Sequence, residues 1–151
     1  SRINAEALAP LQNDVRPLTK FLSQPDGELG GMFWIGPAGT FTPLHHDLTN
    51  NLLVQVVGRK RVVLVDAVAL PRLYNDQHVV SEVRDLTDPA LDLTRFAKLN
   101  GLTAYDVELR PGQALFIPVG WWHQVASLDF SVSITYTNFI WPNDFHVGHP
   151  A

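Results

Sequence analysis

Three side chains of this sequence could together bind a metal ion, and two of them are almost adjacent in the chain. His45 and Asp47 follow a Gly/Pro turn at residues 36–39 and precede an apolar segment typical of a strand. Residues two apart in a strand project from the same face, so these two side chains point together while His46 points away. A third nitrogen ligand would complete a two-histidine, one-carboxylate set, which is typical of Fe(II) sites with open coordination positions.

His123 is the candidate for the third ligand. It follows two tryptophans and a Pro/Gly loop at residues 118–120, at the start of a predicted strand. This position predicts that it lies at the end of a sheet, as we expect for His45 and Asp47. A His-x-Asp tripeptide alone is a weak signal that needs structural context. The alternatives are a surface hydrogen-bonding pair for His45 and Asp47 and a hydrogen-bonded core histidine for His123.

Lys60 begins a row of side chains that is otherwise apolar. Lys60, Val62 and Leu64 share one face of a predicted strand that follows a tight turn at Gly58. A lysine in an inward-facing row is costly unless its charge is paired. The carboxylate of a bound cosubstrate would pair it, whereas the alternative is a basic hairpin turn in water.

The elements that must position these residues are short predicted strands separated by turn signals. The strands beyond the metal-binding stretch cover residues 32–35, 51–57, 60–65, 105–109, 114–117, 123–128 and 131–140. Many short, mostly antiparallel strands describe a sandwich or a barrel. We predict an all-β fold, a double-stranded β-helix of the jelly-roll or cupin type. The run at 32–35 is apolar throughout, which predicts a strand buried on both faces.

Two parts of the chain lack this strand pattern. Residues 1–30 predict an N-terminal helical segment, and residues 31–151 form the predicted catalytic barrel. An insertion at residues 66–103 interrupts the barrel on the outside of the sheet. It is rich in charges and holds two predicted short helices, at 69–74 and 89–99.

The composition fits one globular domain without cysteine chemistry. Of the 151 residues, 46% are hydrophobic and 17% are charged, which is typical of a folded chain. Since there is no cysteine, disulfides and thiolate zinc sites are excluded, and we expect a reducing, cytoplasmic environment. No apolar run approaches the ~18 residues of a membrane span, so we expect no membrane partner. The net charge of -4 argues weakly against a nucleic-acid partner, which stays an open alternative.

Four segments, in their order and spacing, resemble the JmjC/cupin-like Fe(II)- and 2-oxoglutarate-dependent oxygenases. They are WIGPAGT at 34–40, TPLHHD at 42–47, NLLVQVVGRK at 51–60, and the stretch from Pro111-Gly112 through FIPVGWWH at 116–123. Within that family the chain most resembles the small protein-hydroxylase branch. The family's upstream cosubstrate tyrosine and dimerisation region are not identifiable in this sequence, and a homodimer stays an alternative.

The resemblance implies a ligand set and an activity. Fe(II) would be held by His45, Asp47 and His123, and the far carboxylate of 2-oxoglutarate would meet Lys60 and Thr42. The implied reaction uses O2 to hydroxylate a C–H bond, most readily on a protein or peptide side chain, with succinate and CO2 as co-products. The further implied contacts are Asn51 and Asn138 around the cosubstrate and metal, and Trp34, His46 and Trp121 on the substrate side.

Three other functions stay open on the sequence alone. The barrel could be a cupin-like binding module without turnover, or an oxygenase that acts on tRNA or a small molecule. A zinc-dependent cupin isomerase is a third alternative, against which Lys60 and the two-histidine, one-aspartate set argue.

Overall fold

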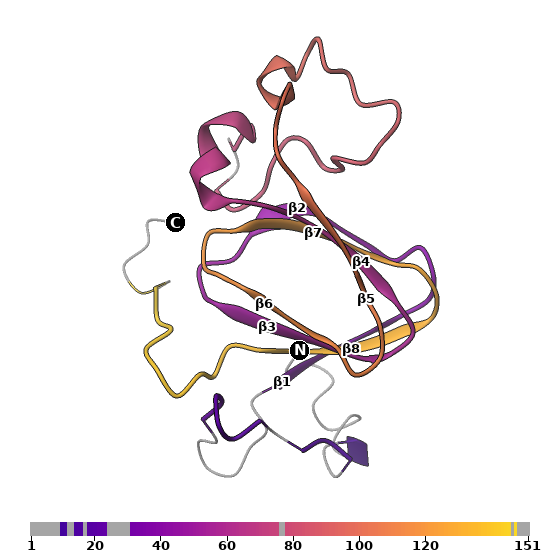
Figure 1. The fold of residues 1–151 in the computed structure, drawn as a ribbon, viewed down its shortest axis with the longest axis vertical. Coiled ribbons are helices and arrows are strands. Elements are labelled where there is room, and N and C mark those ends of the chain that lie inside the picture. The colour runs from indigo at the N-terminus through magenta and orange to yellow at the C-terminus, as the bar shows by residue number, and fades with distance from the viewer. Residues whose placement is uncertain are drawn as a thin grey trace.

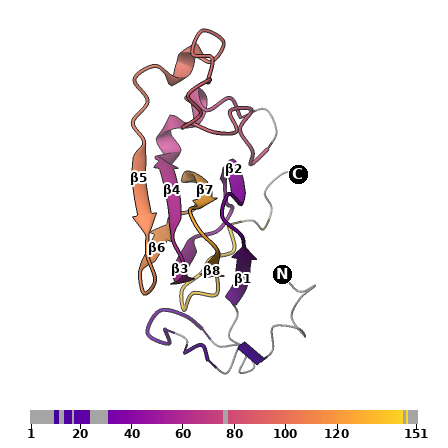
Figure 2. The same ribbon diagram turned by 90° about the vertical axis from the view of Figure 1, so that its right-hand side faces the viewer.

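The computed structural model describes residues 10–11, 14–16, 18–23, 31–75, 78–145 and 147. Nearly all of the regular structure in these ranges is β (Figures 1 and 2). The strands are β1 (Gly31–Gly36), β2 (Phe41–His46), β3 (Asn51–Val57), β4 (Lys60–Val65), β5 (Tyr105–Leu109), β6 (Ala114–Ile117), β7 (Trp122–Ser127) and β8 (Ser131–Tyr136). Among the described residues, no helix is long and apolar enough to cross a membrane.

The strands form two four-stranded sheets that face each other (Figure 1). One sheet has the order β1-β8-β3-β6 and the other the order β2-β7-β4-β5, and the strand pairs within both are antiparallel. Neighbours in each sheet are mostly distant in sequence, as in a jelly roll, where the chain alternates between sheets. The prediction of a nearly all-β, antiparallel fold is confirmed.

The core between the sheets contains the row that begins at Lys60. On β4, Lys60, Val62 and Leu64 are only 8%, 0% and 5% exposed. Val62 and Leu64 pack with Leu53 of β3 and Ile117 of β6, which belong to the opposite sheet. The alternating pattern of β4 thus directs a lysine and two aliphatic side chains into the same interior, as the sequence predicted.

Strand β1 differs from its prediction. It is an edge strand that pairs only with β8 among the described residues, and it is not buried on both faces. Met32, Trp34 and Ile35 are 43%, 45% and 47% exposed. An apolar run alone cannot distinguish a central strand from an edge strand, because the difference depends on which neighbours the topology supplies.

The insertion packs on the outer face of the β2-β7-β4 sheet, and Figure 1 shows it beyond that sheet. The two α-helices predicted there are not confirmed: the insertion holds 3-10 helices η3 (Ala67–Arg72) and η4 (Ala97–Leu99). Across the second predicted helix, Asp88 and Asp92 accept hydrogen bonds from backbone N–H groups two residues ahead, at 2.8 and 2.9 Å. These local side-chain bonds favour turns over a continuous helix.

The predicted N-terminal helical segment lies largely outside the described residues. Of those described, Leu18 accepts hydrogen bonds from Phe21 and Leu22 in a turn. Leu22 then forms a β-bridge with Phe139 and is 2% exposed. This part of the chain packs on the β1-β8-β3 sheet, on the side opposite the insertion (Figure 1).

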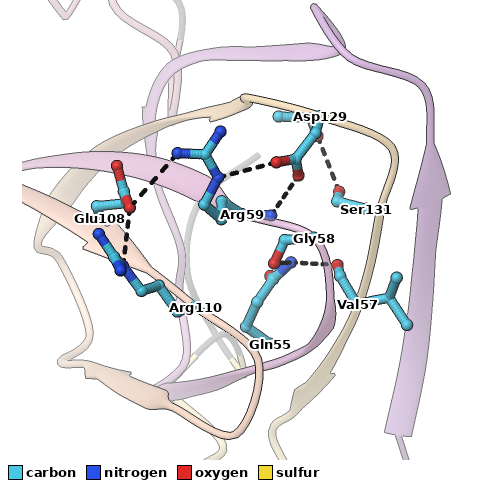
Figure 3. Close-up of polar contacts among 9 residues, drawn as sticks. Gln55, Val57, Gly58, Arg59, Glu108, Arg110, Asp129 and Ser131 are labelled. Carbon is cyan, nitrogen blue, oxygen red and sulfur yellow. Dashed lines mark hydrogen bonds and ion pairs between the residues drawn. The ribbon is translucent and has the colours of Figure 1, made fainter.

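The turn between β3 and β4 is hydrogen-bonded to the turn between β7 and β8 (Figure 3). The backbone N–H of Arg59 donates to the Asp129 carboxylate, and the Arg59 guanidinium Nε donates to it at 2.9 Å. Gln55 Nε2 donates to the carbonyl of Gly58 at 3.1 Å. Gly58 has φ +68°, and a Cβ there would lie 2.1 Å from the carbonyl oxygen of Phe130, so only glycine fits. The turn therefore fixes where β4 begins.

Candidate metal centre

The side chains of His45, Asp47 and His123 lie together at one end of the barrel. The β2–β7 pairing sets His45 directly opposite His123, and their ring centroids are 4.2 Å apart. Asp47 follows β2, and its carboxylate oxygens lie 4.0 Å from His45 Nε2 and 3.7 Å from His123 Nε2. One potential ligand atom from each residue falls within 4.8 Å of the others. This spacing suits three ligands of a single ion.

Backbone carbonyls orient both imidazoles toward the shared centre. His45 Nδ1 lies 2.8 Å from the Pro43 carbonyl oxygen, and His123 Nδ1 lies 3.1 Å from that of Trp121. A carbonyl can only accept, so each Nδ1 carries the proton and each Nε2 presents a lone pair. This arrangement is the usual outer shell of metal-binding histidines.

Two contacts hold Asp47 in place. Asn51 Nδ2 donates to Asp47 Oδ2 at 3.1 Å, and the backbone N–H of Gly120 donates to the Asp47 carbonyl at 3.1 Å. Asn51 Oδ1 is buried and has no hydrogen-bond partner among the described residues. The resemblance placed Asn51 around the cosubstrate and metal. In the structure its Nδ2 donates to Asp47, and its Oδ1 has no donor among the described residues.

The electrostatics of the cluster favour a cation. Burial, and after it the neighbouring His45, lowers the pKa of the His123 imidazole, while Asp47 opposes both; the resulting pKa is about 4. His123 is therefore neutral near pH 7, the state in which an imidazole binds a metal. The residues present fit an Fe(II) ion: two lone pairs, one carboxylate and an outer shell that fixes all three.

The cluster forms one end of a cavity of about 230 Å³ between the sheets. Lys60 lines the same cavity, and its Nζ donates to Ser133 Oγ at 2.6 Å. Within the described part of the chain, no carboxylate forms an ion pair with Lys60, and burial lowers the pKa of its ammonium group. The remaining lining residues are Met32, Trp34, Thr42, Thr49, Asn51, Leu53, Ile117, Val125, Thr135 and Thr137.

Strand register gives the depth of Lys60 relative to the metal-binding cluster. On β4, Leu64 is opposite His123, whereas Lys60 is opposite Ser127, four residues further along. At roughly 3.3 Å per residue, these positions are about 13 Å apart along the strand. The cavity therefore has a candidate metal site near one end and a buried cation deeper inside.

Three residues expected near cosubstrate or substrate do not line this cavity. The ring of His46 packs edge-on against Trp122, and Trp121 packs near Tyr105. Asn138 Nδ2 donates to the carbonyl of Ser23 at 2.6 Å, which ties the end of the barrel to the N-terminal segment. By contrast, Trp34 and Thr42 lie on the cavity wall.

A clamp that the sequence did not reveal holds the loop after Asp47. Asn143 Oδ1 accepts from the backbone N–H of Asn50 at 2.7 Å, while Asn143 Nδ2 donates to the carbonyls of Asn50 and Thr137 at 3.0 and 2.7 Å. Asn50 Oδ1 in turn accepts from the backbone N–H of Val119 at 3.0 Å. The sequence around Asn143 has no strand or helix period, so only the fold could indicate this role.

Two facing antiparallel sheets with a two-histidine, one-aspartate cluster in the cavity between them define a cupin-type barrel. The chain belongs to the cupin-like domain family, whose model matches residues 3–145. This confirms the resemblance to JmjC and cupin-like proteins.

Individual relatives carry different names. Lysine-specific demethylase JMJ30 of Arabidopsis thaliana is 38% identical over 145 residues, which cover 89% of this chain and 33% of the relative. The tRNA wybutosine-synthesizing protein 5 of Gallus gallus is 37% identical over 110 residues, covering 73% of this chain and 33% of the relative. The solved structure of YcfD, a ribosomal oxygenase from Escherichia coli, is 22% identical, covers 78% of this chain and 24% of its own, and has a TM-score of 0.48. The chain spans a third or less of the length of these proteins.

Proposed function

We propose that this domain is an Fe(II)- and 2-oxoglutarate-dependent dioxygenase that hydroxylates a C–H bond on a protein or peptide side chain. One observation carries the proposal: a single cavity combines two imidazole Nε2 atoms and a carboxylate with a deeper, buried ammonium group. A metal ion would match the imidazole and carboxylate end of the cavity. The far carboxylate of a dicarboxylic keto acid would match the ammonium group at the other end. The volume of about 230 Å³ lies below the ~300 Å³ at which pockets begin to hold drug-sized ligands, and so suits a small cosubstrate.

His45 Nε2, His123 Nε2 and a carboxylate oxygen of Asp47 would hold Fe(II). Bound Fe(II), with 2-oxoglutarate and O2, supplies the oxidative chemistry that adds one oxygen atom to a C–H bond and yields succinate and CO2. The protein contributes position: Asn51 and the two backbone carbonyls keep the ligands oriented before the ion arrives. Pre-set ligands avoid a cost of reorganisation when the ion binds.

Lys60 and Thr42 would bind the far carboxylate of 2-oxoglutarate. In the part of the chain that the structure describes, the Lys60 ammonium has one partner, Ser133 Oγ, which leaves donors for a charge-assisted hydrogen bond to the ligand. Leu53 and Val125 line the cavity with apolar atoms. An apolar wall excludes water, and this strengthens the ion pair between ammonium and carboxylate.

The residues near the cavity support a protein or peptide substrate. Met32 and Trp34 line the cavity and remain 43% and 45% exposed, and the indole N–H of Trp34 donates to Thr135 Oγ1 at 2.9 Å. Exposed apolar and aromatic groups suit side chains of a polypeptide. A nucleic-acid substrate would call for a basic surface, whereas Lys60 is the only lysine or arginine that lines the cavity in the described part of the chain.

Succinate formation tests the proposal. Anaerobically purified protein is given Fe(II), 2-oxoglutarate and O2, with and without a peptide library, and succinate and oxygenated peptides are measured by mass spectrometry. We expect succinate from the wild-type chain, none from His45→Ala or Asp47→Ala, and a raised 2-oxoglutarate requirement for Lys60→Ala.

Two results would contradict the proposal. No succinate under any of these conditions would favour a binding module without turnover. Oxygenation of tRNA but of no peptide would indicate a tRNA substrate, as the name of the relative tRNA wybutosine-synthesizing protein 5 suggests for that protein.

A further inference from the structure

The strand that carries His45 contains a β-bulge beside the metal-binding cluster. Between the pairs Thr42↔Val125 and His45↔His123, β2 advances three residues while β7 advances two. A bulge re-aims the side chains that follow it and leaves its extra residue without a ladder partner. Because Leu44 in the bulge is 0% exposed, its backbone N–H and C=O need partners inside the protein.

The insertion supplies these partners. The backbone N–H of Leu44 donates to the Arg84 carbonyl at 2.9 Å, and the backbone N–H of Ser81 donates to the Leu44 carbonyl at 3.1 Å. One residue beyond His45, the backbone N–H of His46 donates to the Val79 carbonyl at 2.9 Å. Residues 79–84 thus run antiparallel beside the edge of β2, and they bond to the residues on both sides of His45.

The same part of the insertion is also fastened to the strand that carries His123. Gln124, the next residue on β7, is 3% exposed. Its Oε1 accepts from the backbone N–H of Leu86 at 2.8 Å, and its Nε2 donates to Asp85 Oδ1 at 2.6 Å. Residues 79–86 therefore bridge the two ligand strands from the outer face of the sheet.

Ser81 stabilises this bridge internally. It is 2% exposed, its hydroxyl donates to the Leu73 carbonyl at 2.5 Å, and its Oγ accepts from the backbone N–H of Val83 at 3.0 Å. The side chains of Ser81 and Gln124 thus hold residues 79–86 in place through two separate sets of hydrogen bonds.

We propose that residues 79–86 are a positioning element for the metal site, held by Gln124 and Ser81, which sets the angle and separation of His45 and His123. This inference rests on the proposed metal site. Outer-shell partners of metal ligands typically change metal affinity by about 10- to 100-fold when removed. Because none of residues 79–86 lines the cavity, the loss of this segment would act through the ligand strands.

Metal affinity of the whole chain, measured apart from turnover, tests the proposal. Mn(II), a spectroscopic stand-in for Fe(II), is titrated anaerobically and free Mn(II) is followed by electron paramagnetic resonance, with urea unfolding run in parallel. Gln124→Leu removes both side-chain bonds at nearly constant volume. The double variant Gln124→Glu/Asp85→Asn keeps an acceptor for the Leu86 N–H and restores the bond between residues 124 and 85 with donor and acceptor exchanged. Asp92→Ala is the matched control, because it removes the Asp92 turn bonds elsewhere in the insertion.

We expect Gln124→Leu to raise the Mn(II) dissociation constant about 10-fold or more, the double variant to recover most of it, and Asp92→Ala to leave it unchanged. Ser81→Ala is measured alongside and decides the question if Gln124→Leu does not fold. An unchanged dissociation constant in the folded variants, or an equal loss in Asp92→Ala, would overturn the positioning role while leaving the metal site intact. A wild-type chain that binds no Mn(II) would instead overturn the proposed function itself.

Discussion

Replacing Lys60 by Met should make the protein more stable and at the same time weaken its binding of 2-oxoglutarate. Methionine keeps most of the side-chain volume and removes an ammonium group whose only partner among the described residues is Ser133. Burying a charge costs several kcal/mol, and leaving Ser133 Oγ without its donor costs about 1–3 kcal/mol. We expect a net gain of about 1 kcal/mol or more in the free energy of unfolding at neutral pH.

The stability gain should depend on pH in a defined direction. Burial lowers the pKa of Lys60 below its ordinary value of 10.5, so the folded chain releases this proton before the unfolded chain does. Between the two pKa values the unfolded chain binds more protons, and stability therefore rises with pH in that window. The penalty from Lys60 is complete below the folded pKa and fades toward pH 10.5. The advantage of Lys60→Met should shrink accordingly.

The expected loss of affinity follows from removing one partner of a buried charge pair, which costs about 2–5 kcal/mol. This corresponds to a dissociation constant for 2-oxoglutarate at least about 30-fold higher. Urea unfolding between neutral pH and pH 10, and calorimetry with Mn(II) present, measure the two effects. Arg61→Met is the control: Arg61 faces outward on the same strand in an exposed pair with Asp106, and its loss should cost at most ~1 kcal/mol.

Either of two results would refute this account of Lys60. A Lys60→Met variant less stable than the wild type at every pH would mean that the ammonium is already compensated within the protein. A dissociation constant for 2-oxoglutarate within about threefold of the wild type would mean that Lys60 does not meet the cosubstrate.

Three further substitutions test the elements around the site. Gly58→Ala should lower the free energy of unfolding by about 2 kcal/mol or more in urea unfolding, because φ is +68° and the added Cβ would collide with backbone; an unchanged midpoint would contradict this. Asn143→Leu should cost about 1 kcal/mol in the same assay, since it leaves partly buried groups of Asn50 unpaired, and a neutral effect would show that the clamp is dispensable. Asn51→Leu should raise the Mn(II) dissociation constant about 10-fold by freeing Asp47, whereas unchanged binding would remove Asn51 from the ligand support.

The fold was predictable because its signals are local. The two-residue period of a strand and the Gly58 turn predict that Lys60, Val62 and Leu64 enter an interior together, and β4 is buried along this face. The insertion was predicted less well, because residues 89–99 were predicted to form one helix, whereas Asp88 and Asp92 form separate side-chain turns there. Helix start signals and turn signals use the same residue types, and packing decides between them.

The sequence predicted the parts of the candidate site that follow from the two-residue period of a strand. It could not predict contacts between segments that are far apart in the chain. The shared direction of His45 and Asp47 follows from their spacing, but the pairing of His45 with His123 depends on strand order. Asn138 is an amide that bonds to Ser23 instead of facing the cavity, and sequence spacing cannot distinguish the two placements. Gln124 was missed because its partners are in the insertion, 38 and 39 residues away.

Metal stoichiometry measures the central claim most directly. Anaerobic Mn(II) titration of the wild-type chain, followed by electron paramagnetic resonance, should give one tightly bound ion per chain. The same titration of folded Asp47→Ala and His123→Ala should show that ion lost. An ion retained after either substitution, or no binding by the wild type, would contradict a single site held by His45, Asp47 and His123.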